Sequence, residues 1–225
     1  MLRIGHRGAC GYEPENTLRS FNRALQLDVD MIELDVHVCR SGELVVIHDE
    51  KVDRTTNGKG YVADQTLDEL RVLDAGKGER IPTLPEVLDL VDRKAQVNIE
   101  LKGVGTAKPV SELLEKYVRE FGSSYDDFLI SSFKHDELQE FRRLSRESRI
   151  GVLTMGISAG VVEFAEKVAA YSINMYKEFV TKELVDDIHK RGMKVLVWTV
   201  NDVEDIEKMR RMGVDGIFSN YPDRI

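Results

Sequence analysis

A loop near the start of the sequence combines residue types that could act on an anionic substrate. The segment GHRGACGYEPENT places His6 and Arg7 between two glycines, Gly5 and Gly8. Glycines allow the backbone to bend close to a ligand. An imidazole exchanges protons near neutral pH, and a guanidinium binds phosphate or carboxylate oxygens. The loop is therefore a candidate for acid–base chemistry, and the alternative is a sharp turn that happens to contain a basic pair.

Two further segments place carboxylates on one face of a strand. Apolar residues alternate with Glu33 and Asp35 in MIELDVHV, and with Glu100 and Lys102 in VNIELKG, so each polar set shares a face. In a barrel strand the apolar set faces the helices, and we expect the carboxylates to point inward. The alternatives are a half-exposed strand with a solvated acidic face and a structural salt bridge between Glu100 and Lys102.

Three carboxylates in one barrel mouth repel one another. At ~4 Å and an effective dielectric constant near 20, each pair costs about 4 kcal/mol. A cation would offset this cost, and oxygen ligands without thiolates favour Mg²⁺ or Ca²⁺ over zinc. The sequence therefore predicts that Glu33, Asp35 and Glu100 bind one divalent cation.

A hairpin is expected to return a second histidine to the same place. If the chain turns at the SG dipeptide, the strand Leu44–His48 folds back antiparallel on residues 31–38. Paired residue numbers then sum to roughly 81–84, which places His48 beside Glu33 or Asp35. Such a mouth suits phosphodiester cleavage, because one imidazole accepts the nucleophile's proton and the other protonates the leaving alkoxide.

The elements that position these residues alternate between strand and helix. This alternation predicts parallel βαβ units and a (β/α)8 TIM barrel. The alternative is a doubly wound sheet, but the sequence has no GxGxxG loop after the first strand to support it. The expected strands are Leu2–Gly5, Met31–Val38, Val97–Leu101, Phe128–Ser131, Ile150–Leu153, Tyr171–Asn174, Lys194–Val200 and Asp215–Phe218, and helical patterns cover 17–27, 83–93, 110–121, 181–192 and 202–213.

One segment, residues 40–81, interrupts the alternation. It contains the short strand of the hairpin and a Gly- and Asp-rich run, and it is too long for an ordinary loop. We interpret residues 1–225 as a single domain with this segment inserted after the second strand, at the barrel face where chemistry takes place.

Composition narrows the classes of function. The net charge of -8 argues against general nucleic-acid binding, which needs a basic face. Cys10 and Cys39 have no disulfide-framework spacing, and no stretch reads as a signal peptide or a membrane span. We therefore expect a cytoplasmic protein without stable membrane association. The sequence leaves the oligomeric state open.

An ordered set of motifs resembles a known family over nearly the whole chain. GHRG, PENT, IELDV, VVIHD, DRTTNGKG, LDAG, IPTLPEVL, NIELK, WTVN and GVDGIFSNYPD are similar to the glycerophosphodiester phosphodiesterase family. The resemblance implies a (β/α)8 barrel with a small insertion and metal-dependent hydrolysis of glycerophosphodiesters, such as glycerophosphocholine or glycerophosphoethanolamine, to glycerol 3-phosphate and an alcohol. It further implies that His6 and His48 act as general acid and base. Glu33, Asp35 and Glu100 would bind the metal, and Arg7 and Lys102 would bind the phosphate.

Several positions stay open under this resemblance. Glu15 and Asn16 of PENT either shape the site or cap the following helix. Trp198 is either a core aromatic or a substrate-facing wall, and we take it as substrate-binding. Ser219-Asn220 stands where the family often shows Thr-Asp, which removes a charge at the barrel mouth.

Two other functions remain alternatives. One is a phospholipid-directed phosphodiesterase of the phospholipase C or D type, which needs an apolar rim, whereas the inserted segment is polar. The other is a barrel that binds glycerophosphate compounds without catalysis. The head group, the choice between Mg²⁺ and Ca²⁺, and the choice between attack by water and attack by the substrate's own hydroxyl are not fixed by the sequence.

Overall fold

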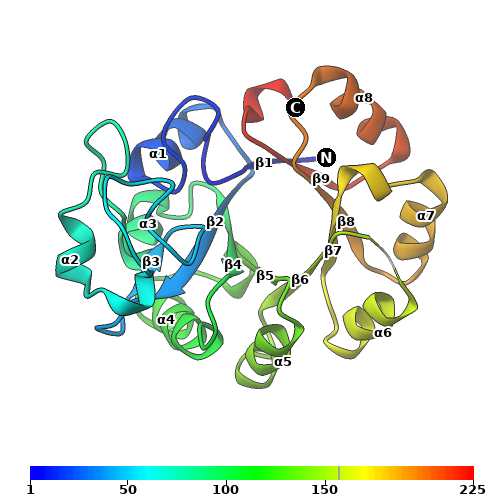
Figure 1. Ribbon diagram of the computed structural model, residues 1–225. Coiled ribbons are helices and arrows are strands. Elements are labelled where there is room, and N and C mark those ends of the chain that lie inside the picture. The colour runs from blue at the N-terminus through cyan, green and yellow to red at the C-terminus, as the bar shows by residue number, and fades with distance from the viewer. Residues whose placement is uncertain (157) are drawn as a thin grey trace.

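A closed barrel of eight parallel strands forms the centre of the protein. The computed structural model describes residues 1–156 and 158–225, and Figure 1 looks down the barrel with its helices outside. Strand β1 pairs with both β9 and β2, which closes the ring. The barrel strands are β1 (Leu2–Gly5), β2 (Met31–Val38), β4 (Gln96–Leu101), β5 (Phe128–Ser132), β6 (Arg149–Thr154), β7 (Ser172–Tyr176), β8 (Lys194–Trp198) and β9 (Gly216–Ser219). The predicted TIM barrel is confirmed, although β8 ends two residues before the predicted bound.

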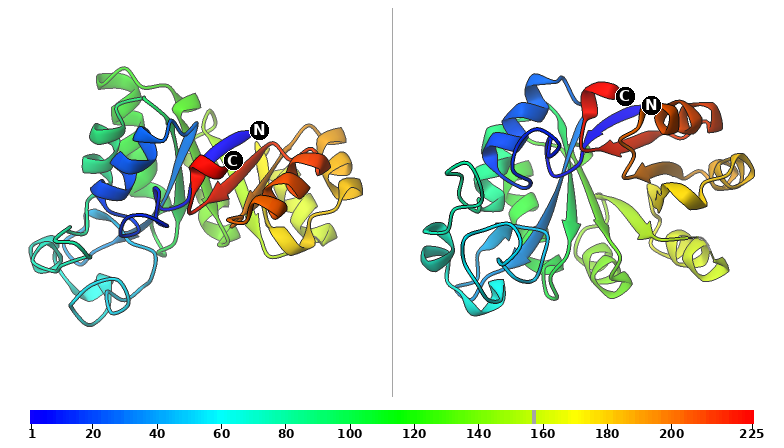
Figure 2. Two further views of the ribbon diagram at one scale, coloured as in Figure 1. Left: turned by 90° about the horizontal axis from the view of Figure 1, so that it is seen from above. Right: turned by 45° about the horizontal axis from the view of Figure 1, so that its top comes forward.

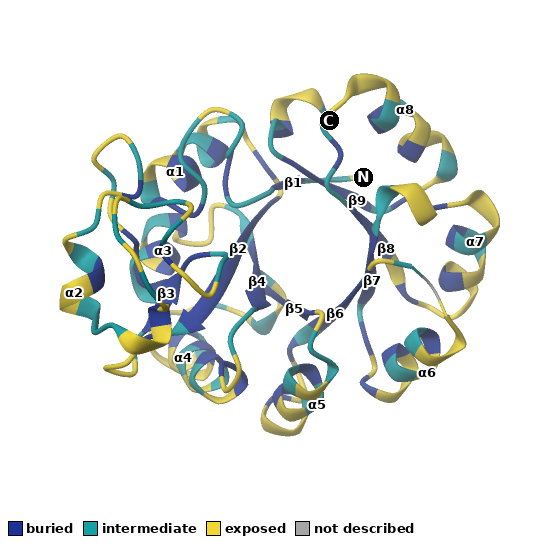
Figure 3. Cartoon of the chain, viewed as in Figure 1, coloured by how far each residue is buried: buried dark blue, intermediate teal, exposed yellow. Residues whose placement is uncertain are grey.

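Helices that begin at polar caps and bury an apolar stripe surround the strands. Thr17 and Thr83 cap their helices by accepting backbone N–H groups, and Thr83 forms a capping box with Glu86. Figure 3 shows that the buried residues lie on the strands and on the helix faces turned toward them. The helices are α1 (Leu18–Gln26), α3 (Leu84–Val91), α4 (Ala107–Glu120), α5 (His135–Leu144), α6 (Ala159–Lys167), α7 (Lys182–Lys190) and α8 (Val203–Met212).

The two faces of β2 have opposite chemistry. Ile32, Leu34 and Val36 are fully buried in the core between strands and helices. The alternate residues Glu33 and Asp35 are also buried, on the barrel side. The pleat of β2 thus delivers both carboxylates inward, as the alternation predicted.

The predicted insertion lies between β2 and α3. It contains β3 (Leu44–Val46), the short helix η1 (Val62–Asp64) and α2 (Leu67–Arg71), and Figure 2 shows it as a lobe at one side of the barrel. The lobe has a small apolar core of its own, which includes Val45, Ile47, Val52, Val62 and Leu70. It can therefore keep a fixed shape beside the barrel.

The hairpin differs from the prediction in its length. β3 pairs antiparallel with β2 through Val36 and Val46, within the predicted range of registers, but the pairing ends at Val46. Continued pairing would place His48 opposite Leu34, on the helix side of the sheet. The strand pairing instead ends at Val46, so His48 is a loop residue. The prediction that hairpin pairing places His48 beside Glu33 or Asp35 is therefore wrong.

Candidate active site

Three carboxylates converge at the mouth of the barrel. Glu33 and Asp35 lie on β2, Glu100 lies on β4, and Asp35 is the register partner of Glu100. All three side chains are buried, and each offers an oxygen within 4.8 Å of the others. This is the acidic trio that the two alternating strands predicted.

Burial and neighbouring charges shift the pKa values of the three carboxyls in different directions. Burial, together with the repulsion from Asp35, raises the pKa of Glu100 to about 7 and raises that of Glu33 well above its ordinary range. Burial would also raise the pKa of Asp35, but the positive charges of Arg7 and Lys102 hold it below its ordinary range. In this environment Asp35 is the carboxyl most easily ionised, and Glu33 and Glu100 hold their protons more readily than exposed glutamates do.

The donor set fits a hard divalent cation. Asp35 Oδ1 is buried without a hydrogen-bond partner among the described residues, and Lys102 Nζ lies 3.6 Å from it. Its second oxygen, Oδ2, accepts a hydrogen bond of 2.8 Å from Asn16 Nδ2. An orphaned carboxylate oxygen next to two further carboxylates is the environment that Mg²⁺ or Ca²⁺ requires.

The first loop inserts Arg7 between these acids. Its backbone N–H donates to Glu33 over 2.8 Å, and its side chain contacts Glu15 at 2.8 Å and Asp35 at 3.4 Å. The residue adopts a φ of 50°, in the left-handed region that non-glycine residues seldom occupy. Such an outlier supports a functional constraint on this loop.

The glycines of the loop serve packing against a helix. A Cβ atom at Gly8, which has a φ of +86°, would lie 2.6 Å from the backbone of Ser20 in α1. A Cβ at Gly5 would lie 2.7 Å from the carbonyl oxygen of Gly8. The close approach is thus between the loop and α1, whereas the sequence analysis assigned it to a ligand.

His6 points one ring nitrogen at the last strand. Its Nδ1 lies 2.7 Å from Asn220 Oδ1, and the Sγ of Cys10 lies 3.1 Å from the same oxygen. Burial and the charge of Arg7 lower the pKa of His6 to about 4. His6 is therefore neutral near pH 7, with a ring nitrogen available as a proton acceptor.

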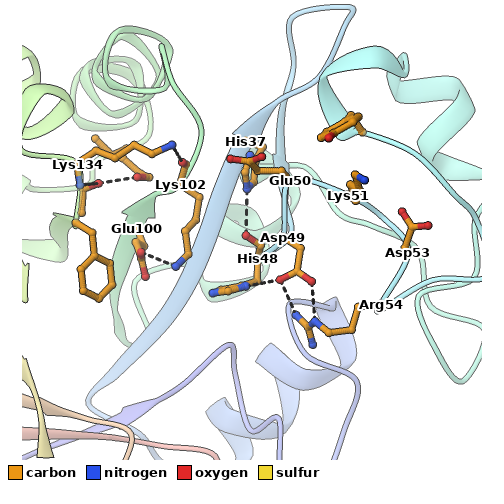
Figure 4. Close-up of a pocket in the computed structure, with 14 residues that line it drawn as sticks. His37, His48, Asp49, Glu50, Lys51, Asp53, Arg54, Glu100, Lys102 and Lys134 are labelled. Atoms are coloured by element: carbon orange, nitrogen blue, oxygen red, sulfur yellow. Dashed lines mark hydrogen bonds and ion pairs between the residues drawn. The ribbon is translucent and has the colours of Figure 1, made fainter. Parts of the chain in front are cut away.

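His48 is held by Asp49 of its own loop and by His37 of strand β2. Its Nδ1 lies 2.6 Å from Asp49 Oδ1, and its carbonyl oxygen lies 3.1 Å from the Nε2 of His37, as Figure 4 shows. Burial lowers the pKa of His48, and the charge of Asp35 acts in the opposite direction. Unlike His6, this imidazole is backed by a carboxylate.

An ion-pair chain that the sequence analysis missed links the two histidine loops. Arg54 contacts both oxygens of Glu15, at 2.7 and 2.8 Å, and also contacts Asp49 at 2.7 Å. Glu15 in turn contacts Arg7. The DRTTNGKG motif contains Arg54. A charged residue in a Gly-rich loop next to the barrel mouth could have been expected to pair with an acidic residue there.

PENT shapes the site. Asn16 has a φ of 57°, and its amide holds Asp35. The helix cap is Thr17, whose hydroxyl accepts the N–H of Ser20 over 3.2 Å. The interpretation of Asn16 as the cap is therefore wrong.

Two cavities that share lining residues occupy the mouth. The smaller, about 180 Å³, is lined by both proposed catalytic histidines, by Glu33 and Glu100, and by Trp198. The larger, about 620 Å³, lies toward the insertion, and Figure 4 shows its lining from Lys134 to Arg54. Four residues line both cavities, so the two spaces are neighbours: His48, Glu100, Lys102 and Phe133.

Trp198 combines the two interpretations left open by the sequence. The ring is half-buried, and its Nε1 donates to the carbonyl oxygen of Asn174 over 3.0 Å. The ring also lines the smaller cavity. Because its only donor is already used, it can offer a substrate its apolar face alone.

Among the described residues, no helix is long and apolar enough to cross a membrane.

Comparison with known proteins identifies the family of the chain. The model of the glycerophosphoryl diester phosphodiesterase family matches residues 6–224. A glycerophosphodiester phosphodiesterase of Caldanaerobacter subterraneus is 42% identical, over 100% of this chain and 96% of its own. An Oleispira antarctica phosphodiesterase, solved in complex with the product sn-glycerol-3-phosphate, is 32% identical with a TM-score of 0.91, over 99% of this chain and 94% of its own. A Galdieria sulphuraria structure described as a putative glycerophosphodiester phosphodiesterase is also 32% identical, with a TM-score of 0.87, over 97% of this chain and 93% of its own. The chain therefore belongs to the glycerophosphoryl diester phosphodiesterase family, whose members are hydrolases.

Proposed function

We propose that this protein hydrolyses glycerophosphodiesters, such as glycerophosphocholine and glycerophosphoethanolamine, to glycerol 3-phosphate and an alcohol. The observation that carries the proposal is that His6, His48, Glu33 and Glu100 line one cavity, with Asp35 next to the two glutamates. The related Oleispira antarctica structure, which holds sn-glycerol-3-phosphate, supports the glycerol side of the substrate.

Glu33, Asp35 and Glu100 would hold one divalent cation, Mg²⁺ or Ca²⁺. When bound, such a cation neutralises charge on the phosphoryl oxygens and favours the ionised form of its ligands. The orphaned oxygen of Asp35 and the raised pKa of Glu100 support this assignment. Magnesium and calcium both accept such oxygens.

Arg7 and Lys102 would bind the phosphate. Arg7 reaches the mouth from the first loop, and Lys102 follows β4, so the two cations approach from different strands. Lys102 Nζ is 2.7 Å from Glu100 and lines both cavities. Fixed cations placed where charge develops stabilise a phosphoryl transition state.

The hydrogen-bond partners of His6 and His48 indicate which proton transfer each histidine would carry out. The amide oxygen of Asn220 accepts from His6 Nδ1, which leaves Nε2 of the neutral ring to take the nucleophile's proton. Burial lowers the pKa of His48, but the Asp49 carboxylate acts against this and stabilises the imidazolium, so of the two imidazoles His48 would be the one that protonates the leaving alkoxide. Each imidazole is thus oriented for one role.

Two nucleophiles fit this arrangement. Water could attack phosphorus directly, or the glycerol 2-hydroxyl could attack first and form a cyclic phosphate. In both routes His6 accepts the proton. A 2-deoxyglycerol analogue that is cleaved at the normal rate would exclude the internal route.

Release of glycerol 3-phosphate would place the reaction in glycerol and lipid metabolism. A cytoplasmic location is part of the proposal, and the free state of Cys10 and Cys39, both within the described residues, supports a reducing compartment.

The test is an assay that couples released glycerol 3-phosphate to its dehydrogenase, with Mg²⁺ or Ca²⁺ and several head groups. We expect turnover by the native chain and a loss of at least about 100-fold in His6→Ala and His48→Ala. The melting temperatures should stay near that of the native chain. A large fall in melting temperature with little loss of turnover would favour a structural role and a non-catalytic barrel.

A further inference from the structure

His37 lies on the same face of β2 as two of the proposed cation ligands. Side chains two residues apart point to the same side of a strand, so His37 follows Glu33 and Asp35 on this face. Its register partner on β3 is Val45, which packs in the apolar core of the insertion. At the level of His37, this face of β2 therefore looks onto the insertion. The side chain is buried, at 6% exposure, and a buried polar side chain needs a hydrogen-bond partner.

That partner is the backbone of the proposed general acid. The Nε2 atom of His37 lies 3.1 Å from the carbonyl oxygen of His48, and Figure 4 shows this contact as a dashed line between the two residues. A carbonyl oxygen can only accept a hydrogen bond, so Nε2 carries the hydrogen and donates it. The bond thus fixes the main chain at residue 48 without occupying the imidazole of His48.

The main chain at His48 has few other attachments. Strand β3 ends at Val46, and the N–H of Ile47 donates to the carbonyl oxygen of Asp35 over 3.0 Å. Within the part of the chain that the structure describes, neither the N–H nor the carbonyl group of His48 pairs with another backbone group. The side chain of His37 therefore replaces the strand pairing at the point where that pairing stops.

The loop after β4 limits the movement of the His37 ring. A Cβ atom at Gly103 would lie 3.2 Å from Nδ1 of His37 and 3.4 Å from its Cα atom, so the main chain of Gly103 packs closely against this residue. The N–H of Gly103 also donates to the carbonyl oxygen of Val36 over 3.2 Å, which ties the loop to β2. Because its ring has little room to turn, His37 offers His48 a fixed point of attachment.

The position of His37 on β2 relates the acid to the acidic trio. Asp35 and His37 are two residues apart, a separation of about 7 Å along a strand. One strand therefore positions a proposed cation ligand and, through His37, the loop that carries His48. Of the two cavities at the mouth, His37 lines the larger and His48 lines both. This placement suits a residue that acts on the phosphate through His48.

We propose that His37 is a positioning residue for the reaction, whose hydrogen bond to the carbonyl oxygen of His48 holds that imidazole within reach of the leaving head-group oxygen. This inference rests on the proposed function and adds a residue to it. In the step concerned, the bond from phosphorus to the head-group oxygen breaks while a proton passes from His48 to that oxygen. A displaced acid slows this step, and the effect is largest when the leaving alkoxide is strongly basic.

The test compares two leaving groups on the same glycerol 3-phosphoryl group. Choline leaves as a basic alkoxide that needs a proton, whereas nitrophenolate leaves from the 4-nitrophenyl ester without one. We expect His37→Leu to lower kcat for glycerophosphocholine about tenfold, and kcat for the nitrophenyl ester by less than about twofold. His37→Gln, whose amide N–H can donate to the same carbonyl oxygen, should keep kcat for glycerophosphocholine within about threefold of the native value.

Two further variants complete the experiment. His48→Ala should show the same dependence on the leaving group more strongly, and His37→Leu added to His48→Ala should cost no further activity, because the two residues act as a unit. His189→Leu is the matched control. It removes a 2.7 Å contact with Asp215 at the end of α7 that leads into β8, and kcat for both substrates should stay at the native value.

Three outcomes would overturn the inference while the native chain still cleaves glycerophosphocholine. An equal loss for both substrates in His37→Leu would give His37 a structural role only, and an unchanged kcat would show that His48 is held without it. A further loss on combining His37→Leu with His48→Ala would mean that His37 does not act through His48. Failure of the native chain to cleave either diester would refute the proposed function and this inference with it.

Discussion

The Nδ1 atom of His6, on the first loop, lies 2.7 Å from the Oδ1 atom of Asn220, 214 positions later at the end of the last strand. Closure of the barrel through β1 and β9 creates this contact, because Gly5 and Ser219 are register partners. The contact gives a role to Asn220, which stands where the resemblance of the sequence led us to expect an aspartate. A neutral amide oxygen orients the imidazole, and it favours the protonated form less than a carboxylate would.

Replacement Asn220→Asp should change the pH dependence of turnover. A carboxylate at this position stabilises the imidazolium, so it raises the pKa of His6 from its lowered value of about 4. His6 is then deprotonated only at higher pH, and the acid limb of kcat/KM should move upward by about one pH unit. The pH profile of the variant measures this shift. Gln139→Glu, a similar gain of charge on α5, should leave the limb in place, and an unmoved limb in Asn220→Asp would refute the assigned contact.

Cation binding should depend on Glu33. Burial raises its pKa well above the ordinary range of a glutamate, so the neutral side chain of Glu33→Gln resembles its metal-free state. We expect this variant to keep its melting temperature without added metal, while calorimetric titration shows the affinity for Mg²⁺ or Ca²⁺ reduced at least about tenfold. Glu147→Gln, at an exposed position, is the matched control. Unchanged affinity in Glu33→Gln would mean that the cation binds elsewhere.

Cation binding should also release protons. Without a cation, the pKa of Glu100 is raised to about 7 and that of Glu33 is raised well above its ordinary range, so these carboxyls retain protons to a higher pH than exposed glutamates do. A cation must displace such a proton, and affinity should therefore rise as pH increases from 6 to 8. Calorimetry in buffers of different ionisation enthalpy should show about one proton released per cation at pH 7. Binding without proton release would contradict the raised pKa values.

Arg54 should couple the insertion to the catalytic mouth. Arg54→Met removes its contacts with Glu15 and Asp49, and Asp49 then backs His48 less firmly. We expect kcat to fall about tenfold, and the free energy of unfolding to fall by only about 1 kcal/mol because Arg54 is half-exposed. Lys59→Met, which breaks the exposed pair with Asp53, should change neither value appreciably. Equal effects of the two substitutions would remove the special role of Arg54.

The parts of the site that lie on strands were predictable from sequence. Alternation along β2 and β4 is a direct consequence of the pleat, so Glu33, Asp35 and Glu100 could be assigned to one face before their neighbours were known. The charges that they bring together then required a compensating cation. Local periodicity and simple electrostatics are sufficient for this part.

The loop contacts were not predictable in the same way. Asn16 and Arg7 adopt positive φ values, which no periodic pattern indicates. The partners of Arg54 and His6 depend on how the insertion folds onto the barrel and on how the barrel closes. The hairpin shows where prediction from the sequence fails. The observed register lies within the predicted range, but the pairing ends at Val46, so the position of His48 is set by its loop and not by the hairpin.

The most direct test of the central claim is phosphorus NMR of glycerophosphocholine incubated with the protein and a divalent cation in water enriched in oxygen-18. The account predicts that the diester resonance is replaced by that of glycerol 3-phosphate carrying one labelled oxygen on phosphorus, and that His48→Ala abolishes this conversion. An unchanged diester resonance with the cation bound, or a product whose phosphate carries no label, would contradict it.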